Sequence, residues 1–115
     1  EKYRILFEES PDGYLVIKDG KFIDCNKAVI GLLGRPKEEI VGLTPSQISP
    51  DVQPNGRLSA EYEKEMIEKT DHEDQVNFEW VHLHKEGTEF LVEISLSKVI
   101  FNGEEVIFTS WKNIT

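Results

Sequence analysis

The chain has 115 residues, which suits one domain with a single hydrophobic core. Its 22 acidic and 13 basic residues give a formal net charge of -9, and such a surface repels the phosphates of nucleic acid and of anionic membranes. No apolar run approaches the roughly 18 residues that cross a bilayer, and the lone Cys25 cannot form an internal disulfide, so we expect a cytoplasmic domain without membrane contact.

The first part of the chain combines one helix signal with a hairpin signal. Apolar residues at helical spacing predict a short helix over residues 2–9. Segments rich in β-formers at 14–17 and 22–25 flank Asp19-Gly20, a dipeptide that is typical of tight hairpin turns. We therefore predict a helix followed by two antiparallel strands.

Several short helices fill the middle of the chain, each with its own start and stop. Asn26 stands where a helix N-cap belongs, and Gly34 is a natural helix end. Acidic residues after Pro36 predict a second short helix, and residues 44–47 form a capping-box pattern. A longer helix is predicted over 59–70, with Ser59 as its cap.

The last part of the chain changes to strand character. Segments 76–84, 89–101 and 105–112 are rich in β-branched and aromatic residues. Along 89–101 apolar residues alternate over much of the length, which places Phe90, Val92, Ile94 and Leu96 on one face. Asn102-Gly103 between the second and third of them is a strong hairpin signal. The sequence therefore predicts an α+β fold, in which a five-stranded antiparallel sheet carries the short helices and the longer helix on one face.

Apolar side chains on both faces of this sheet indicate a second cover. In the last strand, Val106 and Phe108 point to one side while Ile107 and Trp111 point to the other. The amino-terminal helix or another subunit must then shield the second face. We expect a homodimer that forms through the amino-terminal helix and the sheet.

The order and spacing of several motifs resemble the PAS family, including its carboxy-terminal PAC segment. The resemblance covers nearly the whole chain 1–115, taken as a single PAS/PAC domain and a fragment of a larger protein. The matching segments are Ser10-Pro11-Asp12-Gly13-Tyr14-Leu15-Val16-Ile17, Phe22-Ile23-Asp24-Cys25-Asn26-Lys27-Ala28, Gly31-Leu32-Leu33-Gly34, Glu39-Ile40-Val41-Gly42, Phe78-Glu79-Trp80-Val81-His82, Gly87-Thr88-Glu89-Phe90, Val92-Glu93-Ile94-Ser95-Leu96 and Asn113-Ile114-Thr115. Asn113 stands where the family usually has aspartate.

The resemblance implies a non-enzymatic input domain that binds a small ligand or relays a conformational signal. It also implies a covalently linked effector after Thr115, such as a diguanylate cyclase or a histidine kinase. Signal relay is then expected through Trp111, Asn113 and Thr115 at the end of the last strand.

A ligand cavity between the sheet and the helices is the candidate binding site. The side chains that we expect to line it are Tyr62, Met66, Phe78, Trp80 and Ile94. Glu79 and His82 are candidates for a polar anchor, and because residues alternate along a strand they lie on opposite faces. The pattern leaves open which of the two points inward.

Cofactors that absorb light or bind gases are disfavoured by the histidine and cysteine positions. Haem-binding PAS domains carry a histidine in or near the long central helix, whereas residues 59–70 contain none and His72 lies just past their end. Cys25 does not lie in the Asn-Cys-Arg-Phe segment of flavin-binding relatives. His82 and His84 share a strand face, but two ligands alone do not make a metal site. We expect no metal, and a small organic molecule as any ligand.

Two other functions remain open on the sequence. A ligandless dimerisation module would use the same apolar helix and two-faced sheet. A small cone-shaped enzyme of the ketosteroid-isomerase type has a similar size, although two strands here precede most of the helices and no Asp/Tyr pair stands out.

Overall fold

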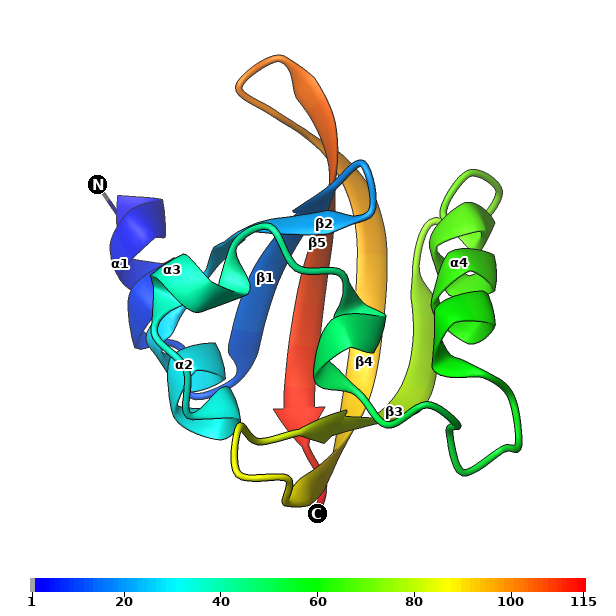
Figure 1. Ribbon diagram of the computed structural model, residues 1–115. Helices are drawn as coiled ribbons and strands as arrows, with labels where there is room; N and C mark the ends of the chain where they lie inside the picture. Colours follow the sequence, from blue (N-terminus) through cyan, green and yellow to red (C-terminus); the bar gives the residue numbers. More distant parts are fainter. Residues whose placement is uncertain (1) are drawn as a thin grey trace.

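The computed structural model describes residues 2–115, with side chains from Arg4 onward, and forms one antiparallel sheet with helices on both faces (Figure 1). The elements in chain order are α1 (Lys2–Glu9), β1 (Gly13–Lys18), β2 (Lys21–Cys25), α2 (Lys27–Leu33), α3 (Lys37–Ile40), the 3-10 helix η1 (Pro45–Ile48), α4 (Ser59–Lys69), β3 (Val76–Leu83), β4 (Glu89–Phe101) and β5 (Glu104–Asn113). The predicted fold class and element order are confirmed.

The sheet joins the two ends of the chain. Its strand order is β2-β1-β5-β4-β3, so the first strand pairs with the last one. Leu15 lies opposite Thr109 across β1 and β5, and Ile94 lies opposite Trp111 across β4 and β5. The central position of β5 places its side chains in the middle of both sheet faces.

Two hairpin turns follow the sequence signals closely. Asp19 and Gly20 have φ angles of 53° and 79°, and Asn102 and Gly103 have φ angles of 52° and 77°. Consecutive residues with positive φ are the mark of the type I′ turn, whose twist matches that of paired strands. These dipeptides therefore fix the β1–β2 and β4–β5 pairings.

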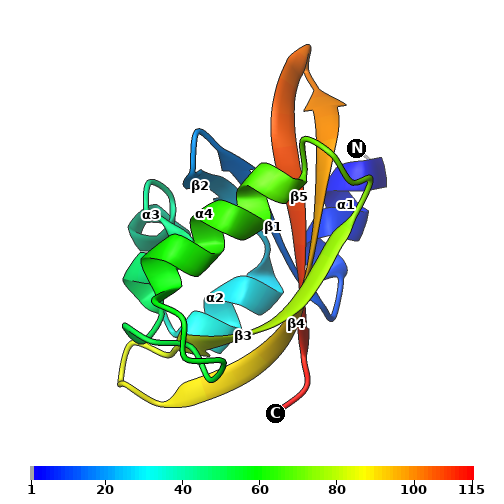
Figure 2. The ribbon, with the colours of Figure 1, turned by 90° about the vertical axis from the view of Figure 1, so that its right-hand side faces the viewer.

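The helices divide unequally between the two faces of the sheet. Figure 2 shows α2, α3 and α4 on one side and α1 on the other. Phe7 of α1 is buried, and its ring lies 6.1 Å from that of Tyr14 on β1. Helix α1 thus covers part of the outer face, which is the second cover that the apolar pattern of β5 required.

The main core fills the space between the inner face of the sheet and helices α2–α4. Alternation along β4 buries Phe90, Val92, Ile94 and Leu96, as the sequence pattern predicts. The other buried apolar residues of this core are Leu15, Ile17, Phe22, Cys25, Val29, Leu33, Ile40, Ile48, Met66, Val76, Trp80, Ile107 and Trp111.

The start of α4 differs from the sequence prediction. Leu58 occupies the N-cap position, and Ser59 is already inside the helix. The Ser59 hydroxyl instead donates to the carbonyl of Pro50 at 2.5 Å and accepts from Gln53 Nε2 at 2.9 Å. A serine before a helical stripe predicts a cap from local spacing alone, but here the loop before α4 supplies a more favourable partner.

Gln53 protects the free edge of β3. Its side-chain amide accepts from the Val81 N–H at 2.8 Å and donates to the Val81 carbonyl at 3.1 Å. This imitates the pairing of one further strand residue, so the loop 49–57 covers a sheet edge that would otherwise expose unpaired backbone groups.

None of the helices in the described part of the chain combines the length and apolar character that crossing a bilayer requires.

Candidate functional site

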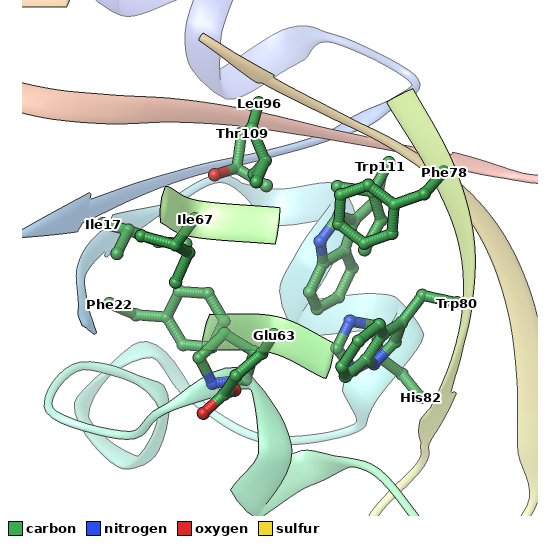
Figure 3. Close-up of a pocket in the computed structure, with 12 residues that line it drawn as sticks. Ile17, Phe22, Glu63, Ile67, Phe78, Trp80, His82, Leu96, Thr109 and Trp111 are labelled. Atoms are coloured by element: carbon green, nitrogen blue, oxygen red, sulfur yellow. The ribbon is translucent and has the colours of Figure 1, made fainter. Parts of the chain in front are cut away.

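A small cavity lies between the inner face of the sheet and the segment η1–α4 (Figure 3). Its volume is about 20 Å³, whereas a single water-sized sphere needs about 10–15 Å³ on the same measure. The lining residues are Ile17, Phe22, Pro45, Glu63, Ile67, Phe78, Trp80, His82, Ile94, Leu96, Thr109 and Trp111. The interior is therefore almost filled by side chains.

The structure brings together three of the five side chains expected at this cavity. Phe78 and Trp80 of β3 and Ile94 of β4 line it. Tyr62 stacks on Trp80, with ring centroids 5.6 Å apart, without lining the cavity, and Met66 is buried elsewhere in the core.

The rotation of α4 about its axis explains why Tyr62 and Met66 lie elsewhere. The helix turns Glu63 and Ile67, which are four residues apart, toward the cavity. Residues 62 and 66 precede them by one position, and each residue turns a helix by about 100°. The apolar stripe of α4, which contains Tyr62 and Met66, predicts the buried face of the helix. Glu63, a polar residue at the edge of that stripe, also borders the cavity.

His82 is the polar side chain of β3 that points inward. It has no solvent exposure, whereas Glu79 is exposed on the opposite face. Its ring stacks on that of Trp111, with centroids 4.0 Å apart. Burial without a charged partner lowers the pKa of His82 to about 3, so the ring is neutral at physiological pH.

Ser49, just after η1, organises the polar wall beside His82. Its hydroxyl donates to the Pro45 carbonyl at 2.7 Å and accepts from the Trp80 indole N–H at 2.8 Å. The Ser49 oxygen also lies 3.1 Å from His82 Nδ1. Sequence reasoning missed Ser49 because a loop residue has no periodic pattern that would reveal which way it points.

Glu63 connects α4 to η1 at the rim of the cavity. Its carboxylate accepts from the Ser46 N–H at 2.7 Å and from the Ser46 hydroxyl at 3.2 Å. Partial burial raises the pKa of Glu63, and these hydrogen bonds offset the rise only in part. The carboxylate thus holds the two covering segments together at a cost in desolvation.

Of the three residues expected to relay a signal, Trp111 and Asn113 belong to the carboxy-terminal end of β5, and Thr115 lies two residues beyond it. Trp111 lines the cavity and is buried. The Thr115 hydroxyl accepts from the Leu91 N–H at 2.9 Å and donates to the Leu91 carbonyl at 3.2 Å, while Asn113 Oδ1 accepts from the Thr115 N–H at 3.1 Å. The tail after β5 is thereby fixed to β4.

The remaining cysteine and histidines do not form a reactive or metal-binding group. Burial raises the pKa of the Cys25 thiol to about 11, so little thiolate is present at neutral pH. His72 is exposed, and His84 lies against Gly34 at the end of α2. Within residues 2–115, no three His, Cys, Asp or Glu side chains are arranged to hold a metal ion.

The cavity volume also limits the size of any guest. Cofactor and drug pockets usually enclose about 300–1,000 Å³, and the cavity here has about 20 Å³. A flavin or a haem would therefore require the sheet and its cover to move apart.

A family model and solved structures match nearly the whole chain. A family model described as a PAS domain matches residues 11–115. No curated protein sequence matches the chain. Several solved structures have a similar fold over nearly the whole chain.

The PAS domain of an HTR-like protein from Haloarcula marismortui has a TM-score of 0.83 and 22% identity, covering 98% of this chain and 89% of that chain. A PAS domain of a Colwellia psychrerythraea protein has a TM-score of 0.82 and 20% identity, covering 99% and 95%. A domain of a sensory box sensor histidine kinase/response regulator from Geobacter sulfurreducens has a TM-score of 0.77 and 20% identity, covering 96% and 90%. At these identities the likeness establishes the fold.

Proposed function

This chain belongs to the PAS domain family, and on that premise we propose that it is a sensory input module that relays a conformational signal without catalysing a reaction. The family assignment and the fold shared with a domain of a sensor histidine kinase support a sensing role. No Ser-His-Asp order or phosphate-binding glycine loop is present in the sequence to support catalysis.

The observation that carries the proposal is the stack of His82 on Trp111. His82 and Trp111 both line the cavity, and their ring centroids are 4.0 Å apart. Trp111 lies two residues before Asn113, at which β5 ends. A change in cavity occupancy or packing that displaces the Trp111 ring therefore acts directly on the end of β5.

The signal then leaves through the segment that follows β5. We propose that an effector, a histidine kinase or a diguanylate cyclase, follows Thr115 in a longer cytoplasmic protein. The hydrogen bonds between Thr115 and Leu91 set the position from which that connection departs. Two discrete arrangements of this short segment would be enough to couple the domain to its effector.

Thr115→Val tests the relay in the full-length protein. Removing the hydroxyl breaks both side-chain bonds to Leu91, and we expect the stimulus-dependent change in effector activity to fall about threefold to tenfold. The measurement is effector activity with and without stimulus. Thr115→Ser keeps the hydroxyl and should retain regulation; regulation of the valine variant at the level of the unmodified protein would reject the proposal.

A second role, dimerisation, is favoured by the apolar outer face of the sheet. Ile5 and Leu6 of α1 are 61% and 71% exposed. Beside α1 lies a groove of about 320 Å³, lined by Arg4, Phe7, Val16, Ile23, Asp24, Val99, Phe101, Val106 and Phe108. We propose that a second copy of the chain covers this surface with its own α1.

Leu6→Asp tests the dimer. A charge on the exposed side of α1 should weaken self-association at least tenfold, because it would have to be desolvated in the interface. Sedimentation across a concentration series measures the association constant. Val41→Asp, which alters an exposed apolar residue beside α3, is the control and should leave it unchanged. A monomer at every concentration of the unmodified domain would rule the dimer out.

A further inference from the structure

The outer edge of β3 is covered at one end only. Gln53 bonds both backbone groups of Val81, so the N–H and C=O of Val81 point away from β4. The pairing of β3 with β4 keeps one register along the strand, and backbone groups alternate in direction, so those of Asn77 and Glu79 also point outward. Within the described part of the chain no group bonds to them.

Residues 76–79 of β3 lack the usual protection of an edge strand. Such strands commonly carry a lysine, a proline or a bulge, or are covered by another segment. This stretch has no lysine and no proline, and it pairs with β4 without a bulge. Figure 2 looks toward this edge and shows the loop 49–57 crossing the other end of β3. A further strand can therefore pair with this stretch.

A surface hollow lies on the edge at the point where the cover by Gln53 ends. Its volume is about 370 Å³, which falls within the range of ligand pockets. Tyr62 of α4 stacks on Trp80 and forms the aromatic wall. The full lining is Gln53, Pro54, Asn55, Tyr62, Glu79, Trp80 and Leu91. Because Glu79 lines the hollow, a chain that enters it meets the outward backbone groups of that residue.

The charges around the hollow indicate which partner fits it. Glu79 is the one charged residue of the lining and lies directly opposite Glu93, at a position where side chains of paired strands come closest. Like charges placed in this way repel each other. Lys112 lies opposite Glu93 on β5, whereas Glu79 has no basic residue across the sheet. Glu73 and Asp74, just before β3, are exposed acids as well. A basic side chain beside Glu79 would offset this repulsion.

The same charges disfavour a second copy of the chain at this edge. Two β3 edges paired about a two-fold axis would bring Glu73, Asp74 and Glu79 of both copies together. Each copy also carries a formal net charge of -9. A partner of opposite charge gains from the field that a second copy would have to overcome.

We propose that a basic, extended segment of another protein adds to the edge of β3 as an antiparallel strand along residues 75–79. The partner residue opposite Glu79 exchanges both backbone hydrogen bonds with it and places a lysine or arginine on the same face. The next residue of the partner turns an apolar side chain toward Tyr62 and Trp80. This surface is separate from the cavity and from the α1 face, and it adds a partner to the proposed sensory function.

The test is a titration of the ¹⁵N-labelled domain with a short, end-blocked peptide that alternates lysine and valine, at low ionic strength. We expect saturable shifts that are largest at the amides of Asn77 and Glu79. The same peptide N-methylated at its lysines keeps the charge but loses the donors that face β3, and should bind at least about tenfold more weakly. Equal binding of the methylated peptide, or shifts centred on the acidic face of α4, would overturn the proposal.

Two variants separate the backbone contribution from the charge. Asn77→Pro removes an outward N–H, which an edge strand tolerates, and should weaken binding at least about tenfold. Glu79→Lys should weaken it about threefold to tenfold. Glu38→Lys, the same charge change at an exposed residue of α3, is the control and should stay within about twofold. Unaltered affinity in Glu79→Lys would reject a basic partner, and this variant decides the matter if the proline variant does not fold.

Self-association through β3 is the remaining outcome. Shifts of the Asn77 and Glu79 amides with protein concentration alone, removed by Asn77→Pro but not by Leu6→Asp, would assign the edge to a second copy and overturn the proposal. The relay test with Thr115→Val does not involve this edge, so the two proposals can fail separately.

Discussion

Replacing Asn26 with aspartate is expected to lower the free energy of unfolding by about 3–5 kcal/mol at pH 7, because it places an unpaired charge in a fully buried site. Asn26 has 0% solvent exposure. Urea unfolding of the two proteins at a series of pH values measures the difference.

The side-chain amide of Asn26 uses all four of its hydrogen-bonding positions. Its Nδ2 donates to the carbonyls of Phe7 at 2.8 Å and Asp12 at 3.0 Å, and its Oδ1 accepts from the N–H groups of Tyr14 at 3.0 Å and Val29 at 3.3 Å. This one residue thus ties α1, β1 and α2 together. An aspartate would direct a carboxylate oxygen at two carbonyl oxygens.

The loss in the Asn26→Asp variant should depend on pH in a defined direction. Burial and the two carbonyls would raise the pKa of the new carboxyl in the folded state above its unfolded value of about 3.9. Below the unfolded pKa the carboxyl is protonated in both states, so its ionisation costs the folded protein nothing. As pH rises from that value through the folded pKa, the free energy of unfolding falls. The variant should therefore recover part of its stability toward pH 4.

Asn55→Asp is the matched control for this change. Asn55 is exposed, and its Oδ1 accepts from the Arg57 N–H at 2.9 Å, which a carboxylate can also do. We expect a change within about 0.5 kcal/mol. An Asn26→Asp protein as stable as the control, or a loss that is the same at every pH, would contradict the role given to Asn26.

Trp111→Ala is expected to cost about 3–5 kcal/mol of folding free energy, the usual range for removing a buried tryptophan. Trp111 is 1% exposed and lies in the middle of the sheet, where β5 pairs with both β1 and β4. Its ring contacts that of His82 and lies 6.3 Å from that of Phe22. Few neighbours can move to fill such a void, so most of the cost should persist.

Ile100→Ala is the control for the tryptophan variant. Ile100 is 68% exposed near the tip of the β4–β5 hairpin, so its truncation should cost less than about 1 kcal/mol. Urea unfolding measures both free-energy changes. Equal m-values for the two variants and the unmodified protein are required, because they show that the denatured states are comparable. A loss below about 1 kcal/mol for Trp111→Ala would mean that the core can close around the missing ring.

The sequence determined the elements of this domain because their signals are local. Alternation along 89–101 identified the buried face of β4, and the two turn dipeptides identified both hairpins. Asn26 as a cap and Gly34 as a helix end were also readable, since each depends on the backbone within one turn of a helix.

Only the tertiary structure decided how these elements produce a site. A period of two places Glu79 and His82 on opposite faces, but the choice of His82 as the inward residue depends on which face α4 and η1 cover. The pairing of β1 with β5 and the rotation of α4 also depend on contacts between distant segments. Ser49 and Gln53 lie in a loop without periodicity, so their buried hydrogen bonds become visible only when the loop is packed against β3.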